Sequence, residues 1–274
     1  MAADRIIAGF DGSEPGRAAA RWAAREAVRQ GLALELVLAG PREPDRAPTA
    51  EANALRVLFP GLDVRIARAP DDPVAALAAA SERAVLLVLG SRGLGSLRGF
   101  LTGSVSRRVL GAAHCPVVLV RAAAGGDTRA EEPRGVTAGV DLAHPCDPVL
   151  DLAFRTAARR EVPLTVVHAW GPPAGNEYLH FGSIGGLEHQ LAADARRALD
   201  TALAPWLERH PELPVSTEVL MGHAGITLVD AASGTGLLVI GARRHHNPVG
   251  AHLGPVAHAV IHHAPCPLAV VPLH

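Results

Sequence analysis

The sequence predicts an α/β fold made of two tandem doubly wound domains, each a parallel sheet with helices on both faces. Short apolar runs typical of buried strands alternate with helical patterns as far as Arg121. Such β-α-β alternation with short connections gives a parallel sheet with right-handed crossovers. The same pattern returns after residue 135, and 274 residues are enough for two domains of roughly 150 residues each.

An internal repeat relates the two halves of the chain. A shift of 130 positions pairs Asp11 with Asp141, and a shift of 151 positions pairs Gly90 with Gly241. The second half therefore has an insertion between its second and third strands, in the Gly/Pro-rich stretch that begins GPPAGNEYLHFG. We expect domains at residues 1–124 and 135–274, joined by a polar linker at residues 125–134.

Local signals place the elements of the first domain. A strand at Arg5–Phe10 ends at Asp-Gly-Ser, and an alanine-rich helix then runs to about Gln30. A later helix is expected at Pro73–Ser81, because proline is favoured in a first turn. The other expected elements are strands at Leu32–Ala39 and Val64–Arg68, a loop at Pro41–Pro48, a short helix at Glu51–Leu58 and, in the second half, a helix around Leu187–Leu207.

The stretch from Ala84 to Arg121 contains the strongest functional signal. It reads as a buried strand at Ala84–Leu89, a glycine-rich loop at Gly90–Gly103, a helix opening at Gly103-Ser104 and a second buried strand after Pro116. The loop thus joins a strand end to a helix start. Doubly wound sheets bind ligands at such a place, because unpaired amides and the helix dipole favour an anion there.

Each small residue of this loop has a physical role. Gly90 is expected to let the chain leave the strand with any φ, and Gly93 to let the backbone approach a ligand without a Cβ. Gly103 leaves room for a phosphate at the helix start, where Ser104 and Ser106 add hydroxyl groups. Glycine loops after strands are common, so the loop is meaningful mainly together with this strand and helix.

At these residues the sequence resembles the universal stress protein family, whose nucleotide-binding members carry the motif G-x2-G-x9-G-[S/T]. Gly90, Gly93, Gly103 and Ser104 match that motif. The resemblance implies an ATP-binding member, with or without Mg²⁺, in which this loop holds ribose and phosphates. It also implies two Rossmann-like domains, each with a five-stranded sheet in the order 3-2-1-4-5.

The resemblance further implies that Phe10 and Asp11 line the adenine side, and that Ala39 lies where family members usually place a valine. Asp71 departs from the family, since many members have glycine before x-Pro. Asp-Gly-Ser is also good capping chemistry, so a second reading is that Asp11 only caps a helix. The expected nucleotide-binding residues are Phe10, Asp11, Ala39, Leu89, Gly90, Arg92, Gly93, Gly103, Ser104, Val105 and Ser106.

The second copy of the motif is altered. Arg244 replaces the second glycine, Pro255 replaces the serine, and Ala257 stands opposite Ser106. Proline offers neither an amide proton nor a hydroxyl, so we expect a site that binds nucleotide weakly or not at all. Cationic compensation could come from Arg243, Arg244, His245 and His246.

Metal and redox chemistry are not expected. Thirteen of the 14 histidines follow residue 143, and His258 and His262 are four residues apart on a predicted helix. They lack acidic or cysteine partners at ligand spacing, so we predict no metal site. The three cysteines form no CxxC pair and are interpreted as buried thiols: Cys115, Cys146 and Cys266.

No catalytic constellation is found. The chain lacks the G-x-S-x-G, H-E-x-x-H and P-loop motifs, and all 26 basic residues are arginine, which excludes a P-loop or Schiff-base lysine. The leading hypothesis is a non-catalytic stress-response module that uses ATP or a related adenine nucleotide as a signal. Two alternatives stay open: a slow ATP-hydrolysing or nucleotidyl-transferring enzyme with a metal on Asp11, and a scaffold that binds partners without nucleotide.

Charge and hydropathy bear on partners and location. A net charge of −1 gives no electrostatic case for binding nucleic acid or an anionic membrane. No signal-peptide core or membrane-length apolar run is present, so we expect a cytoplasmic protein. The apolar last strands, Val117–Val120 and Leu268–Val271, would be exposed sheet edges unless paired. We therefore expect the domains to form an internal pseudo-dimer through them, with a homodimer of the whole chain also open.

Overall fold

The computed structural model describes residues 4–38, 46–69, 72–93, 100–101, 104–121, 134–171, 187–243, 245–247 and 250–273. Within these residues the predicted α/β fold is confirmed. In the following, the first half is the chain up to Arg121 and the second half is the chain from Arg134 onward. Ala39, Asp71, Gly103 and residues 125–133 of the expected linker lie outside the described residues.

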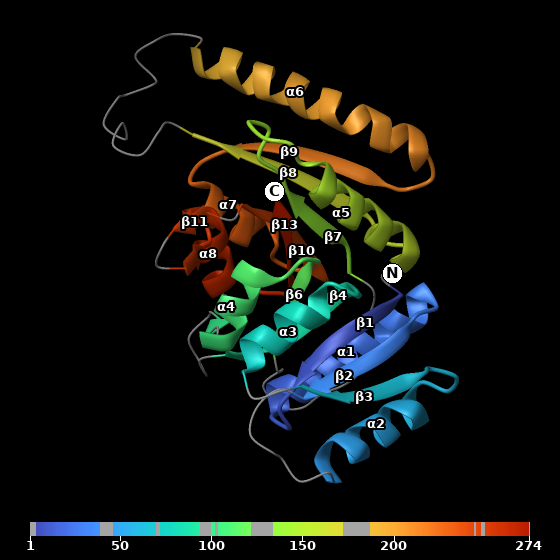
Figure 1. Cartoon of the computed structure of the whole chain (residues 1–274). Helices are drawn as coiled ribbons and strands as arrows, with labels where there is room; N and C mark the ends of the chain where they lie inside the picture. Colours follow the sequence, from blue (N-terminus) through green and yellow to red (C-terminus); the bar gives the residue numbers. More distant parts are fainter. Residues whose placement is uncertain are drawn as a thin grey trace.

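One large sheet runs through both halves (Figure 1). Its main path has the order β3-β2-β1-β4-β6-β13-β10-β7-β8-β9, which is the order 3-2-1-4-5 in each half. The strands are β1 (Arg5–Phe10), β2 (Ala33–Leu38), β3 (Val64–Arg68), β4 (Ala84–Gly93), β5 (Phe100–Leu101), β6 (Val117–Arg121), β7 (Val136–Gly139), β8 (Leu164–Trp170), β9 (Val215–Met221), β10 (Leu237–Arg243), β11 (His245–Asn247), β12 (Gly250–His252) and β13 (Leu268–Leu273).

The two halves meet at β6 and β13. These strands pair antiparallel, with Leu119 opposite Leu268 and Val117 opposite Val270, whereas the other neighbours along the path are parallel. The expected pairing of the two last strands is therefore present. It protects two apolar strands that would otherwise be exposed sheet edges.

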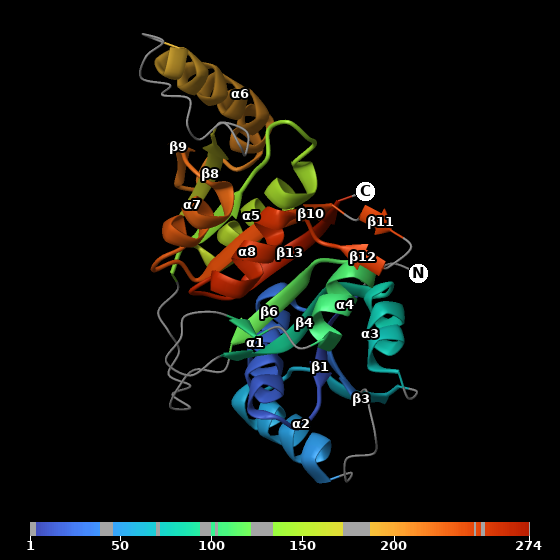
Figure 2. The same cartoon turned by 90° about the vertical axis from the view of Figure 1, so that its left-hand side faces the viewer.

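Helices cover both faces of the sheet (Figures 1 and 2). One hydrophobic core lies under α1, α2, α5 and α6, and the other lies under α3, α4, α7 and α8. Both cores extend across the two halves, because β6 and β13 contribute side chains to each of them. The helices are α1 (Glu14–Gln30), α2 (Arg46–Leu58), α3 (Pro73–Ser81), α4 (Ser104–Ala112), α5 (Asp147–Arg160), α6 (Leu187–Arg209), α7 (Ala224–Ala231) and α8 (Pro255–His263).

Two expected boundaries are wrong. The stretch Pro41–Pro48 was expected to be a loop, but α2 begins at Arg46 and includes Pro48 in its first turn. A proline costs little there, since first-turn amides have no partner within the helix. The stretch Gly90–Gly103 was also expected to be a loop. Instead β4 continues through Gly93, and β5 pairs with its end.

β4 is longer than predicted because β6 pairs with it as far as Ser91 and β5 pairs with Arg92 and Gly93. Gly90 pairs with Val120 and Ser91 with Arg121, so the ladder continues past the last apolar residue of β4. Sequence periodicity cannot reveal this extension, because it depends on the length of a strand 30 residues away. The predicted helix after the loop is confirmed and starts at Ser104.

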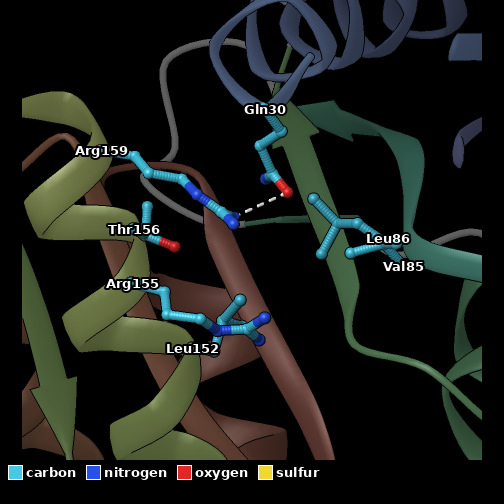
Figure 3. Close-up of a pocket in the computed structure, with 7 residues that line it drawn as sticks. All are labelled: Gln30, Val85, Leu86, Leu152, Arg155, Thr156 and Arg159. Carbon is cyan, nitrogen blue, oxygen red and sulfur yellow. Dashed lines mark hydrogen bonds between the residues drawn. The ribbon is translucent and has the colours of Figure 1, made fainter. Parts of the chain in front are cut away.

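Side chains of α1 and α5 also join the halves. Arg160 donates to the Glu26 carboxylate at 2.9 Å, and its guanidinium lies over the Trp22 ring at 5.3 Å from the centroid. Both members of this ion pair are buried. Beside it, Arg159 donates to the Gln30 side chain at 2.9 Å (Figure 3).

Figure 3 shows a cavity at this contact, bounded by Gln30, Leu86, Leu152 and Thr156 among others. Its volume is about 10 Å³, which suits a single water molecule but not a nucleotide. It also adjoins the start of β4 rather than its carboxyl end. The contact between α1 and α5 is therefore structural, and the ligand site is sought elsewhere.

Candidate functional site

The candidate site lies where the strand order of the first half reverses. The strands β1 and β4 are neighbours there, and the chain leaves their carboxyl ends on opposite faces of the sheet. Asp11 follows β1, Gly90 lies near the end of β4, and α4 begins at Ser104. We call this place the first crevice. Open α/β sheets bind ligands at such a reversal.

Asp11 organises the turn that leads into α1. Its Oδ1 accepts a hydrogen bond from the Ser13 backbone amide at 3.0 Å and another from the Ser13 hydroxyl. Ser13 in turn caps α1, because its Oγ accepts from the Gly16 amide at 3.2 Å. The alternative prediction, that Asp11 itself caps α1, is therefore wrong. Ser13 is the capping residue, and Asp11 accepts hydrogen bonds from Ser13.

Gly90 is required by a close contact with α1. A Cβ at this position would lie 2.4 Å from the carbonyl of Pro15 and 2.8 Å from the Gly16 nitrogen. The residue stays in the β4 ladder opposite Val120, so the predicted reason, a free φ at the strand exit, is wrong. The glycine instead allows the first turn of α1 to lie close against β4 at the crevice.

Gly16 is a residue that the sequence analysis missed. A Cβ on Gly16 would meet Asp11 Oδ1 at 2.6 Å, so this glycine lets the Asp11 carboxylate lie against the helix. A glycine within an otherwise alanine-rich helix lowers helix stability by about 1 kcal/mol relative to alanine. Its presence in this sequence therefore indicated a close contact at that position.

The other predicted site residues lie in different environments, and two of them lie outside the described residues. Phe10 and Leu89 are buried in the two cores, so a ligand contact by either residue would come from the backbone. Ser106 is buried in α4, beside the half-buried Val105. Ser104 starts α4, whereas Arg92 and Gly93 end β4. Ala39 and Gly103 lie outside the described residues.

The second half has a corresponding place between β7 and β10, which we call the second crevice. Asp141 occupies the position of Asp11, and its Oδ1 accepts from the Ala143 amide at 3.1 Å. Its Oδ2 lies 2.9 Å from His144 Nδ1 and 3.3 Å from Arg243 Nη2. Arg243 Nη1 also contacts His144 Nε2. Arg243, one of the expected compensating cations, is thus engaged by its own chain.

Helix starts also differ between the two crevices. The repeat aligns Glu14, the first residue of α1, with His144, but α5 begins three residues later at Asp147. Its cap residue Cys146 makes no side-chain capping bond. At the other side, α8 begins with Pro255 after an uncapped Gly254. Because proline has no amide proton, the start of α8 offers fewer amides than the start of α4.

The next groups to consider are the histidine and cysteine side chains of the described residues. In the described part of the chain, no three His, Cys, Asp or Glu side chains gather where they could hold a metal ion. Burial, followed by the charges of His262 and Arg107, lowers the pKa of His258. Burial raises the pKa of Cys115 and of Cys266 to about 12, so both thiols stay protonated at neutral pH.

Cys146 is only half-buried, so the prediction of buried thiols is correct for two of the three cysteines. Among the helices that the structure describes, none has the length and apolar character needed to cross a membrane.

The fold and the paired crevices define a class of protein: a tandem doubly wound α/β protein in which both halves have one topology. The chain belongs to the universal stress protein family, since the model of the "Universal stress protein family" matches residues 40–121 and again residues 134–272. The predicted family is thereby confirmed.

Curated relatives agree along the length of the chain. Universal stress protein Rv2623 of Mycobacterium tuberculosis is 30% identical over 293 residues, covering 97% of this chain and 95% of the relative. Universal stress protein Rv2005c of the same organism is 29% identical over 291 residues, covering 97% and 96%. A solved universal stress protein from Archaeoglobus fulgidus shares the fold with a TM-score of 0.67 at 16% identity, and 99% of each chain is covered.

Proposed function

We propose that this protein binds ATP in the first crevice and acts as a non-catalytic, nucleotide-dependent module in stress-response signalling. The observation that carries the proposal is the contact of Gly90 with the first turn of α1, which sets two helix starts and Asp11 around the switch point of the sheet. Because ATP is a cytoplasmic metabolite, we also propose that the protein acts in the cytoplasm.

The first crevice fits an adenine nucleotide in its donor and acceptor groups. In the proposed site, the first-turn amides of α4 bind phosphate oxygens, together with the hydroxyls that the motif provides at Ser104 and Ser106. Gly93 and Gly103 complete the family motif in the sequence. Asp11 has an acceptor oxygen for a ribose or base donor. One carboxylate is also enough for a Mg²⁺ ion that arrives with the phosphates, because Mg²⁺ keeps several of its waters.

We propose that nucleotide binds only in the first half. The first motif supplies glycine and serine at the places where the second supplies Arg244 and Pro255. Each lost charge-assisted hydrogen bond is worth about 1.5–3 kcal/mol, so the loss of two would weaken phosphate binding by about a hundredfold or more. We further propose that the halves are domains of residues 1–124 and 135–274, with residues 125–134 as the linker.

The test begins with the ligand that the protein carries. Mass spectrometry of small molecules released from freshly purified protein should find an adenine nucleotide. Isothermal titration with ATP should then give one site per chain. AMP and cAMP are titrated in parallel, since universal stress proteins have been solved in complex with cAMP and with dAMP. A protein that carries no nucleotide and binds none of the three would contradict the proposal and favour the scaffold alternative.

A further inference from the structure

The sheet has two outer edges, one in each half. Among the strands that the structure describes, β3 is the first along the path and β9 is the last, so each has a neighbour on one side only. Figure 1 shows α2 alongside β3 and α6 alongside β9, at opposite ends of the molecule. An open edge presents amide and carbonyl groups with which a strand of another chain can pair.

Backbone hydrogen bonds show which groups of the two edge strands face outward. The Asp63 carbonyl accepts from an amide of β2, and the Pro214 carbonyl accepts from an amide of β8. Successive residues of a strand direct their backbone groups to opposite sides, so the carbonyls of Val64 and Thr217 point away from the sheet. These two carbonyls belong to the outer edges.

An arginine of the flanking helix binds each of these outward carbonyls. Arg56 of α2 donates through Nη2 to the Val64 carbonyl. Arg196 of α6 donates through Nη1 to the Thr217 carbonyl at 3.3 Å. We call Arg56 and Arg196 the edge arginines. A strand that arrives at either edge would have to displace a guanidinium from a carbonyl that it needs for pairing.

Each edge arginine is held by a neighbour on its own helix. Asn53 Oδ1 accepts from Arg56 Nη1 at 3.0 Å, and Asp200 Oδ1 accepts from Arg196 Nε at 3.2 Å. These partners lie three and four residues away, the spacing at which side chains meet on a helix surface. Each guanidinium is therefore held on two sides, by its helix and by the edge strand.

The two edge strands differ in the charges that they carry themselves. The sequence of β3 is VRIAR, which includes Arg65 and Arg68, whereas β9 is VSTEVLM, with Glu218 as its only charged residue. Charged side chains on an edge strand oppose pairing with another chain. The β9 edge therefore depends more on its edge arginine than the β3 edge does.

We propose that the edge arginines close the outer edges of the sheet against a second copy of this chain, with Arg196 as the main barrier. The pairing that it prevents is β9 with β9, because two identical strands can pair antiparallel about a two-fold axis and so form a closed dimer. Neither edge arginine lies in a crevice, so this closure is independent of nucleotide.

Sedimentation velocity of the full chain over a range of concentrations tests the proposal. Arg196→Ala should raise the dimer association constant at least about fivefold, the effect of removing a barrier equal to one hydrogen bond. Arg56→Ala should have a smaller effect, because β3 keeps its own arginines. Arg197→Ala is the matched control, since it removes the next arginine of α6, which pairs with Asp194, and it should sediment like the parent.

A proline in β9 shows whether the new dimer forms through this edge. Thr217→Pro, added to Arg196→Ala, removes an outward amide that a pairing strand requires, and edge strands tolerate proline at such a position. The combined variant should sediment like the parent, with thermal melts as the folding control. Val219→Pro, which removes the next outward amide, replaces Thr217→Pro if that variant does not fold.

Three results would overturn the inference. In the first, the parent and Arg196→Ala sediment equally at every concentration. In the second, the dimer of Arg196→Ala survives the proline, which would place the association on another surface. In the third, the parent itself forms a dimer that Thr217→Pro abolishes, which would show that its β9 edge is open.

Discussion

The absence of a side chain at Gly90 determines how closely β4 and α1 approach each other. Its hydrogen allows β4 to approach the first turn of α1, and Gly16 in that turn allows Asp11 to lie against the helix. Two close approaches thus place a carboxylate and a helix start at one crevice. Neither contact depends on an unusual backbone angle, since neither glycine has a positive φ.

Replacing Gly90 by alanine should destabilise the fold. The new Cβ would lie 2.4 Å from the Pro15 backbone, so α1 or β4 must move, at a cost of about 1–3 kcal/mol. Gly254→Ala is the matched control, because no atom lies within 4 Å of its Cβ position. Urea unfolding of both variants measures the difference. Equal midpoints for Gly90→Ala and the parent would contradict the close contact.

Gly103→Val should abolish ATP binding and leave the fold largely intact. In the proposed site a branched side chain at this position fills the phosphate position at the start of α4 rather than a core. Ser104→Ala should be milder, at about 1–2 kcal/mol, since it removes one hydroxyl and keeps the amides. Calorimetry measures both variants, with thermal melts as the folding control. ATP binding by Gly103→Val at the parent's affinity would place the phosphate site elsewhere.

At the level of secondary-structure elements, α1 contacts both the first crevice and the second half of the chain. Its first turn adjoins the first crevice through Ser13 and Gly16, and its last turns hold α5 through Glu26 and Gln30. The helix ends at Gly31, where φ is 64°, a left-handed value that glycine adopts without strain. One helix therefore connects the candidate ligand site with the contact between the halves.

Ser13→Ala should weaken this helix by about 1 kcal/mol, the usual cost of losing a side-chain cap. The variant loses the acceptor for the Gly16 amide and the hydroxyl donor to Asp11. Cys146→Ala is the corresponding change at α5, where the cap residue makes no side-chain bond, so its loss should be smaller. Chemical unfolding compares the two. A larger loss for Cys146→Ala would show that capping is not what Ser13 contributes.

At the level of the whole molecule, the contacts that join the halves include a strand ladder and a buried ion pair. The ladder is β6 with β13, and the ion pair is Glu26 with Arg160. Burial lowers the pKa of Arg160, and the neighbouring Glu26 carboxylate opposes that effect. Buried ion pairs of this kind add little net stability, but removing one partner leaves an uncompensated charge.

Glu26→Ala should therefore cost about 3–5 kcal/mol, because Arg160 stays buried without its carboxylate. Arg159→Ala, which loses only an exposed hydrogen bond to Gln30, should cost less than about 1 kcal/mol. Thermal and urea unfolding of both variants provide the comparison. If Glu26→Ala does not fold, Glu26→Leu combined with Arg160→Met should restore folding. Equal losses for Glu26→Ala and Arg159→Ala would contradict this account.

Much of this architecture was predictable from the sequence, because apolar periodicity and glycine or proline boundaries are local signals. They predicted β1, β3 and α3 to the residue, together with the repeat and the pairing of the last strands. These local signals failed where the structure depends on contacts between residues that are far apart in the sequence. The end of β4 depends on β5 and β6, the need for Gly90 depends on α1, and Arg243 contacts Asp141 from 102 residues away.

The antiparallel ladder between β6 and β13 has a further consequence, which concerns symmetry. In a dimer of two identical chains, any substitution appears at both sites at once, so a change such as serine to proline would alter both. Here one chain supplies both partners, and tethering keeps them at an effective concentration on the order of millimolar, however dilute the protein is. Pro255 could therefore arise in one half while Ser104 remained in the other.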